Sequence, residues 1–167
     1  MKRLRLILAA LCFVSLAMSQ TETAKPAPTE PGKFYRLDFT VRELEAGKVV
    51  NSRDYSTSMS TNRPNERPSN VSIRSGDRVP IPSDYLNLGT NIDCSDLRQQ
   101  GDHLSLRVKT EITSQVKVEG GTMPLLRQTQ WEADVLIPIR KATVVFSSDS
   151  PTSNGRMQLE ITAAPMN

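Results

Sequence analysis

Apolar and polar residues alternate along most of the chain from residue 35 onward. In Tyr35–Val41 the odd positions are apolar and the even positions are polar or charged. A period of two places one set of side chains on a core and the other in solvent, which predicts a strand. Glu45–Lys48 then provides a turn, with Gly47 free to take a positive φ. Because Val49–Met59 resumes the pattern, the two segments predict a long β-hairpin.

The same alternation returns at short intervals further along. We expect an exposed loop at residues 62–70, a short strand at Val71–Arg74 and a turn at Ser75–Asp77. Prolines 80 and 82 confine any strand there to an edge or a bulge. A strand follows at Tyr85–Cys94, in which Gly89 marks a bulge, and polar residues 96–102 are expected to interrupt the pattern. The remaining predicted strands are Leu104–Thr113, Leu125–Ile137, Thr143–Ser147 and Met157–Ala163.

These segments have strand length, and no amphipathic helical pattern separates them. Such spacing is typical of antiparallel all-β domains, and the clean in/out alternation argues against a parallel sheet covered on both faces. The predicted fold is a single antiparallel β-sandwich, or an open β-barrel-like domain, of about seven or eight strands.

The N-terminus has the features of a secretory signal peptide. Three basic residues precede the apolar segment Leu6–Ala17, and small residues at 17 and 19 fit cleavage before Gln20. A membrane anchor needs roughly 20 apolar residues, and a lipidated Cys12 would need a small residue where Leu11 stands. We therefore predict a signal peptide over 1–19, a flexible Pro-rich leader over 20–32 and a β domain over 33–167, exported to the periplasm or the extracellular space.

Removal of the signal peptide changes the charge balance. The chain has 21 Lys+Arg against 18 Asp+Glu, so without the three basic residues of the signal both counts are 18. No basic stripe remains for nucleic acid. Cys94 becomes the only cysteine, which excludes an internal disulfide. A small buried apolar side chain is favoured for Cys94 over a free reactive thiol or an intermolecular bridge.

Side chains suited to catalysis or metal binding are sparse. His103 is the only histidine and is expected in a solvated turn. The same-face carboxylates Glu132 and Asp134 are interpreted as a solvated surface pairing with Arg107 and Lys109, rather than as an acid/base pair. Glu43 and Glu45 are interpreted in the same way as a solvated sheet surface.

Two further features have a structural and a functional interpretation. Asp93, Asp96 and Asp102 surround a loop but lack a calcium-loop spacing, so ordinary loop aspartates are favoured. Trp131 shares the phase of the apolar residues up to Ile137 and is expected to anchor the core, with a ligand groove as the alternative. We assign no catalytic, cofactor-binding or metal-binding residue.

The C-terminal third resembles a known family. Met123–Arg127, the strand around Trp131 and Ile139–Asp149 follow one another as strand, turn and strand. This order resembles the C-terminal part of bacterial secretin domains over roughly a quarter of the chain, although Ser147–Asp149 replaces the glycine pair usual in secretins. The chain also resembles small signal-peptide-bearing bacterial proteins of unknown function, which share the opening Tyr35–Phe39 and the Ser-Ser-Asp near the end. Neither resemblance implies a site residue.

The sequence thus favours a non-enzymatic, exported β domain that binds or assembles with a cell-envelope partner through its sheet edges. The alternative is a lipid- or glycan-binding β domain with a pocket near Trp131. No cofactor, nucleic acid or transmembrane span after cleavage is expected, and the oligomeric state stays open.

Overall fold

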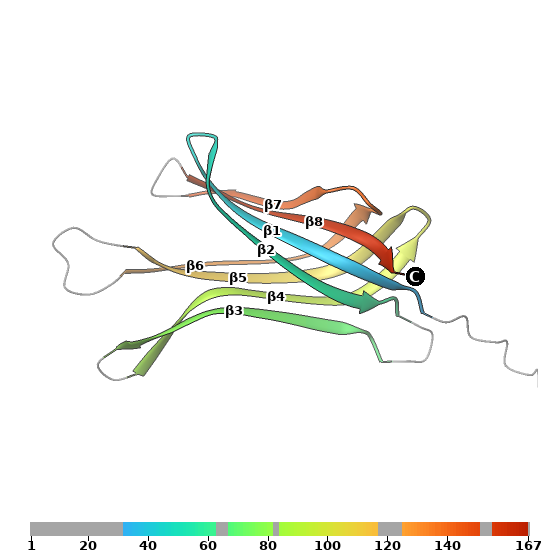
Figure 1. Cartoon of the computed structure of the whole chain (residues 1–167), viewed down its shortest axis with the longest axis horizontal. Coiled ribbons are helices and arrows are strands. Elements are labelled where there is room, and N and C mark those ends of the chain that lie inside the picture. Colours follow the sequence, from blue (N-terminus) through green and yellow to red (C-terminus); the bar gives the residue numbers. More distant parts are fainter. Residues whose placement is uncertain (1–31, 63–66, 82–83, 117–124, 151–154, 167) are drawn as a thin grey trace, which may run out of the picture.

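The computed structural model describes residues 32–62, 67–81, 84–116, 125–150 and 155–166, which fold into eight antiparallel strands in two four-stranded sheets (Figure 1). Sheet A has the order β2-β1-β8-β7 and consists of β1 (Phe34–Glu45), β2 (Lys48–Ser60), β7 (Thr143–Asp149) and β8 (Gly155–Met166). Sheet B has the order β3-β4-β5-β6 and consists of β3 (Asn70–Ile81), β4 (Asp84–Gln100), β5 (His103–Val116) and β6 (Leu125–Pro138). The predicted antiparallel sandwich is confirmed.

The strands follow chain order around the core. Consecutive strands are hydrogen-bonded neighbours except at β2/β3 and β6/β7, and β8 returns to pair with β1. The β1–β2 hairpin turn lies on the left in Figure 1, as do the strand ends at which β3 leads to β4, β5 to β6 and β7 to β8. The two interruptions leave β2, β3, β6 and β7 as edge strands. Within the described ranges there is no helix that could cross a membrane.

The core lies between the sheets and draws on alternate positions of their strands. Most of its buried side chains come from the inner strands β1, β4, β5 and β8. They include Tyr35, Leu37, Phe39, Ile92, Leu97, Leu104, Leu106, Val108, Leu159 and Ile161. The edge strands β2 and β6 add Met59 and Ile137 at the end of the sandwich where β2 and β6 finish. The strand periodicity seen in the sequence therefore identified these buried residues, with the exception of Leu97.

Two predictions around glycines are wrong. The turn predicted at Ser75–Asp77 is absent, because β3 runs straight through it to Ile81. Gly76 lies directly opposite Gly89 of β4, and a Cβ on either residue would meet backbone atoms of the other strand. Gly89 is not a bulge, since the β3–β4 register is continuous there; its φ of +146° and this close approach are what require glycine. The expected edge strand around Pro80 is confirmed.

The bulge of β4 lies later, at Asp96. The register with β5 shifts between Ser95 and Arg98, and Asp96 adopts a φ of 58°. The extra residue redirects Leu97 into the core, where it is fully buried. The prediction that residues 96–102 interrupt the strand is therefore wrong, because β4 continues through the bulge to Gln100 and only then reaches a short turn.

The chain changes sheets in the turn after β6. The Ile139 N–H donates to the carbonyl of Asp102 in the β4–β5 turn of sheet B, at 2.9 Å, while the Arg140 N–H donates to the Ala163 carbonyl of β8 in sheet A, at 2.7 Å. Arg140 adopts a φ of 64°, in the left-handed region. Two consecutive amides thus bind different sheets, which fixes β6 and β7 as edges. The predicted signal peptide and leader lie outside the described residues.

Candidate functional site

The most regular free edge of the molecule is that of β6. This strand pairs only with β5, in an unbroken register from Val116↔Leu125 to His103↔Pro138. Its other side has no backbone partner among the described strands. A strand in this position presents a row of unpaired N–H and C=O groups, which is a template for a further strand.

The other three edge strands have features that hinder strand addition. β7 is only 7 residues long, and Val145 bulges out of its register with β8. The β1–β2 register shifts between Glu43 and Leu44, which leaves Val50 of β2 as an extra residue, and β3 contains Pro80. Bulges, proline and short length are the devices by which natural proteins protect edges. β6 has no bulge and no proline before Pro138, and it contains no lysine; its charged residues are Arg127, Glu132 and Asp134.

The outer face of β6 is polar and acidic. Gln128, Gln130, Glu132 and Asp134 are all exposed there. As predicted, Asp134 pairs with Arg107 of β5, with Nε to Oδ1 at 2.9 Å, and these hydrogen bonds lower the pKa of Asp134. Glu132 lies opposite Lys109 in the register but forms no ion pair with any described residue. The interpretation of this pair as solvated surface charge is therefore supported.

The inner face of β6 is apolar but incompletely covered. Trp131, Ala133 and Val135 are only half-buried, although their direct partners on β5 are buried. The Trp131 ring packs against Phe146 of β7, with ring centroids 5.2 Å apart and planes at 37°. Trp131 thus contacts the core, as predicted, without being enclosed by it. β6 presents an apolar strip that lacks a neighbour on one side.

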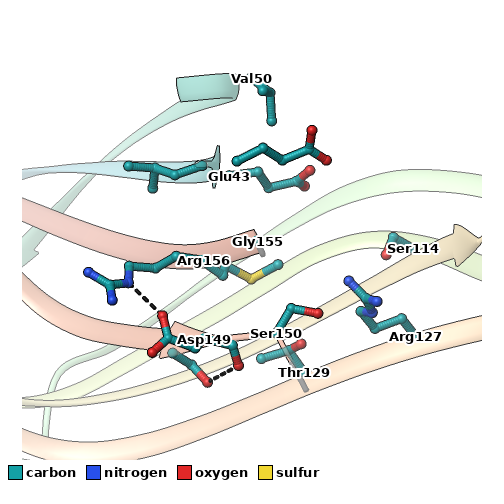
Figure 2. A pocket seen from close by; sticks show the side chains of 13 residues that line it. Glu43, Val50, Ser114, Arg127, Thr129, Asp149, Ser150, Gly155 and Arg156 are labelled. Atoms are coloured by element: carbon teal, nitrogen blue, oxygen red, sulfur yellow. Dashed lines mark hydrogen bonds and ion pairs between the residues drawn. The ribbon is translucent and has the colours of Figure 1, made fainter. Parts of the chain in front are cut away.

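A second feature is a small polar pocket at the hairpin end, with a volume of about 150 Å³ (Figure 2). Glu43 and Glu45 continue the core-facing phase of β1 past the buried Val41. Ser114 of β5 and Arg127 of β6, which are register partners, also line the pocket. The interior between the sheets therefore changes from apolar to polar toward this end.

Charge in this pocket is only partly paired. Asp149 Oδ1 accepts a 2.7 Å hydrogen bond from Arg156 Nε (Figure 2), and this ion pair lowers the pKa of Asp149. No ion pair joins Glu43 or Glu45 to another residue of the described ranges. Glu43 is half-buried and Glu45 is exposed, so both are accessible to solvent. Their interpretation as a solvated surface rather than an acid/base pair stays a prediction, while their position at this pocket follows from the inward phase that they share with Tyr35–Val41. That shared phase was the available signal.

The lone histidine and cysteine lie apart. His103 is exposed and begins β5, next to the turn where it was predicted. Cys94 is buried, and burial, with a smaller contribution from Asp93, raises the pKa of its thiol to about 12. The interpretation of Cys94 as a small buried side chain is confirmed.

The three loop aspartates do not converge. Asp93 lies on the outer face of β4; burial opposes its ionisation, but hydrogen bonds from Ser72 and Arg74 outweigh this and lower its pKa. Asp96 is in the bulge, and Asp102 is in the β4–β5 turn. In the part of the chain that the structure describes, no three His, Cys, Asp or Glu side chains form a group that could hold a metal ion.

Comparison with solved structures finds secretins. The type II secretin GspD from enteropathogenic Escherichia coli matches 81% of this chain and 66% of its own, with 8% identity and a TM-score of 0.44. The Salmonella SPI-1 type III secretion injectisome secretin InvG matches 81% and 64%, with 10% identity and a TM-score of 0.39. Aeromonas hydrophila ExeD matches 81% of this chain and 46% of its own, with 13% identity and a TM-score of 0.42.

The chain thus spans less than two thirds of the length of these structures. No protein-family profile and no curated protein matches it. The matched part is 81% of the chain, whereas the resemblance to secretins in sequence covers roughly a quarter of it, within the C-terminal third. The secretins named from the sequence are thus also found in the comparison of structures, whereas the resemblance to small exported bacterial proteins stays a prediction.

Proposed function

We propose that this chain is an exported, non-enzymatic β domain that binds a protein partner of the cell envelope by accepting a strand at the free edge of β6. The observation that supports it is the 14-residue β6, which pairs on one side only and has no bulge along its register. Strand addition uses main-chain hydrogen bonds for affinity and alternate side chains for specificity. Export and envelope location rest on the N-terminal signal features.

The half-buried inner face of β6 supports the same proposal. A strand added beside β6 would cover the open side of Trp131, Ala133 and Val135, removing apolar surface from water at about 25 cal/mol per Å². Within the described residues, the lone histidine is exposed and the lone cysteine is buried, so the two do not form a nucleophile–base pair. Binding is therefore the activity that this geometry serves best.

The test places a charge at the edge. Ala133→Lys points a lysine inward beside the free edge, a substitution that opposes strand pairing. Thr57→Lys is the matched control, because Thr57 is also a half-buried, inward-phase residue of a long edge strand, β2. Both variants and the wild-type protein are immobilised and exposed to envelope extract, and thermal melting confirms that each is folded.

We expect a partner recovered by the wild-type protein and by Thr57→Lys to be lost with Ala133→Lys. Crosslinking from a photoreactive residue at position 130 should then attach that partner to β6. If folded Ala133→Lys retains the partner, the β6 edge is not the binding site. A ligand pocket beside Trp131 stays a prediction, since the pocket described above is lined by other residues.

A further inference from the structure

We infer that the strand which β6 accepts has basic residues alternating with β-branched apolar residues. This inference rests on the proposed function, and it names the chemistry of the partner segment. It follows from the two faces of β6, because side chains directly opposite each other on neighbouring strands lie about 4.5–5.5 Å apart and interact.

The outer face determines the basic positions. Between Leu126 and Leu136, which are 43% and 56% exposed, every outward residue of β6 is an amide or a carboxylate. Glu132 has no ion-pair partner in the described structure, and Asp134 is bound from the β5 side by Arg107. Lysine or arginine on an added strand would meet these carboxylates from the open side. An acidic residue there would repel them.

The inner face determines the apolar positions. The inward residues Trp131, Ala133 and Val135 lie in register beside the buried side chains of β5, and they extend the core toward the edge. Valine or isoleucine at the facing positions would continue that layer, since β-branched side chains fit a half-buried pleated surface. A polar residue in these positions would leave the apolar side chains at the edge of the core exposed to water. The partner segment is therefore two-faced, with the basic set on the same side as Glu132.

The probe is a capped eight-residue peptide of alternating lysine and valine. Control peptides alternate glutamate with valine, or contain the lysine–valine sequence with N-methyl groups on every second amide. Trp131 is the only tryptophan of the chain and lies on the strand that would be covered, so its fluorescence reports binding directly. We expect the lysine–valine peptide to shift the emission to shorter wavelength and to bind at least tenfold more tightly than either control.

Variants separate charge recognition from edge pairing. Glu132→Gln with Asp134→Asn should weaken lysine–valine binding about tenfold, and Glu132→Lys with Asp134→Lys should make the glutamate–valine peptide the tighter ligand. Asp54→Asn is the matched control, because Asp54 is an exposed acid on the outer face of the other long edge strand, β2. It should leave both affinities unchanged.

The outcomes distinguish this inference from the proposed function. Equal binding of the two charged peptides, abolished by Ala133→Lys, would overturn the charge pattern while leaving strand addition intact. Absence of peptide binding, while Ala133→Lys still loses the envelope partner, would overturn the basic–apolar pattern alone. Concentration-dependent self-association in sedimentation, abolished by Ala133→Lys, would assign the edge to a second copy and overturn the inference.

Discussion

The two buried hydroxyl groups in the core allow a quantitative test of the packing. Thr90 of β4 and Thr110 of β5 are 0% and 4% exposed, and the Oγ1 atom of each has no hydrogen-bond partner in the described structure. Thr90 is the register partner of Ile112, and Thr110 is the register partner of Ile92, so the threonines are diagonal neighbours on one face. Replacement of each by valine removes a buried hydroxyl and keeps the β-branched shape.

A buried hydroxyl without a partner costs about 1–3 kcal/mol relative to its solvated state in mutational data. Thr90→Val and Thr110→Val should therefore each raise the free energy of unfolding by about 1–2 kcal/mol. For a chain of this size, each kcal/mol corresponds to a rise of about 2–4 °C in Tm. The double variant is expected to depart from additivity, because the two residues share neighbours.

The assay is urea unfolding followed by circular dichroism, with the midpoint and slope fitted together. Thr129→Val is the control, since Thr129 has the same inward phase on β6 but is half-buried at the pocket. It should change stability by less than about 0.5 kcal/mol. A loss of stability in Thr90→Val and Thr110→Val would refute the reasoning, because it would show that these hydroxyls are satisfied in solution.

Three further predictions follow from single residues. Gly89→Ala should lower the free energy of unfolding in urea by more than about 2 kcal/mol, because the new Cβ would meet the β3 backbone and the residue has a φ of +146°. Gly101→Ala, which has a φ of +59° but open space around the new Cβ, should lower it by about 1 kcal/mol. Equal losses of stability in the two variants would contradict the close approach of β3 and β4 at Gly89. Cys94 should react with iodoacetamide at pH 8 at least a hundredfold more slowly in the native protein than in urea, as measured by mass spectrometry of the peptide that contains it. The free energy of unfolding should also fall as the pH rises from about 9 toward 12, because only the thiol of the unfolded chain ionises in that range. If a Cys94→Ala variant showed the same dependence of stability on alkaline pH, ionisation of Cys94 would be excluded as the cause. Asp93, whose pKa is lowered on folding, stabilises the native state above about pH 4 and loses that contribution as the pH falls further, so Asp93→Asn should show a shallower acid loss of stability than the wild-type protein.

The sequence predicted the core well because burial and alternation have the same period. Tyr35–Val41 and Leu104–Ile112 have this pattern over whole strands, and their inward residues are buried. The wrong structural predictions concern residues whose type fits more than one local structure. Gly76 and Gly89 are typical of turns and bulges, but their lack of a Cβ here permits a close approach of two strands, which depends on a partner distant in sequence. Leu97 lay in a polar segment, and only the bulge at Asp96 turns it inward.

The candidate site was harder to predict, because an edge is a property of topology rather than of local pattern. β5 and β6 alternate in the same way, and nothing within Leu125–Ile137 distinguishes a strand with two neighbours from a strand with one. That difference arises in the next turn, where Ile139 binds sheet B and Arg140 binds sheet A. If the chain had continued beside β6, β7 would have paired with the free edge of β6 and covered the open side of Trp131 and Val135. After Arg140 the chain instead pairs β7 with β8. Trp131, Ala133 and Val135, which the sequence pattern assigns to the core, are therefore half-buried at an open edge, where we propose that a further strand adds.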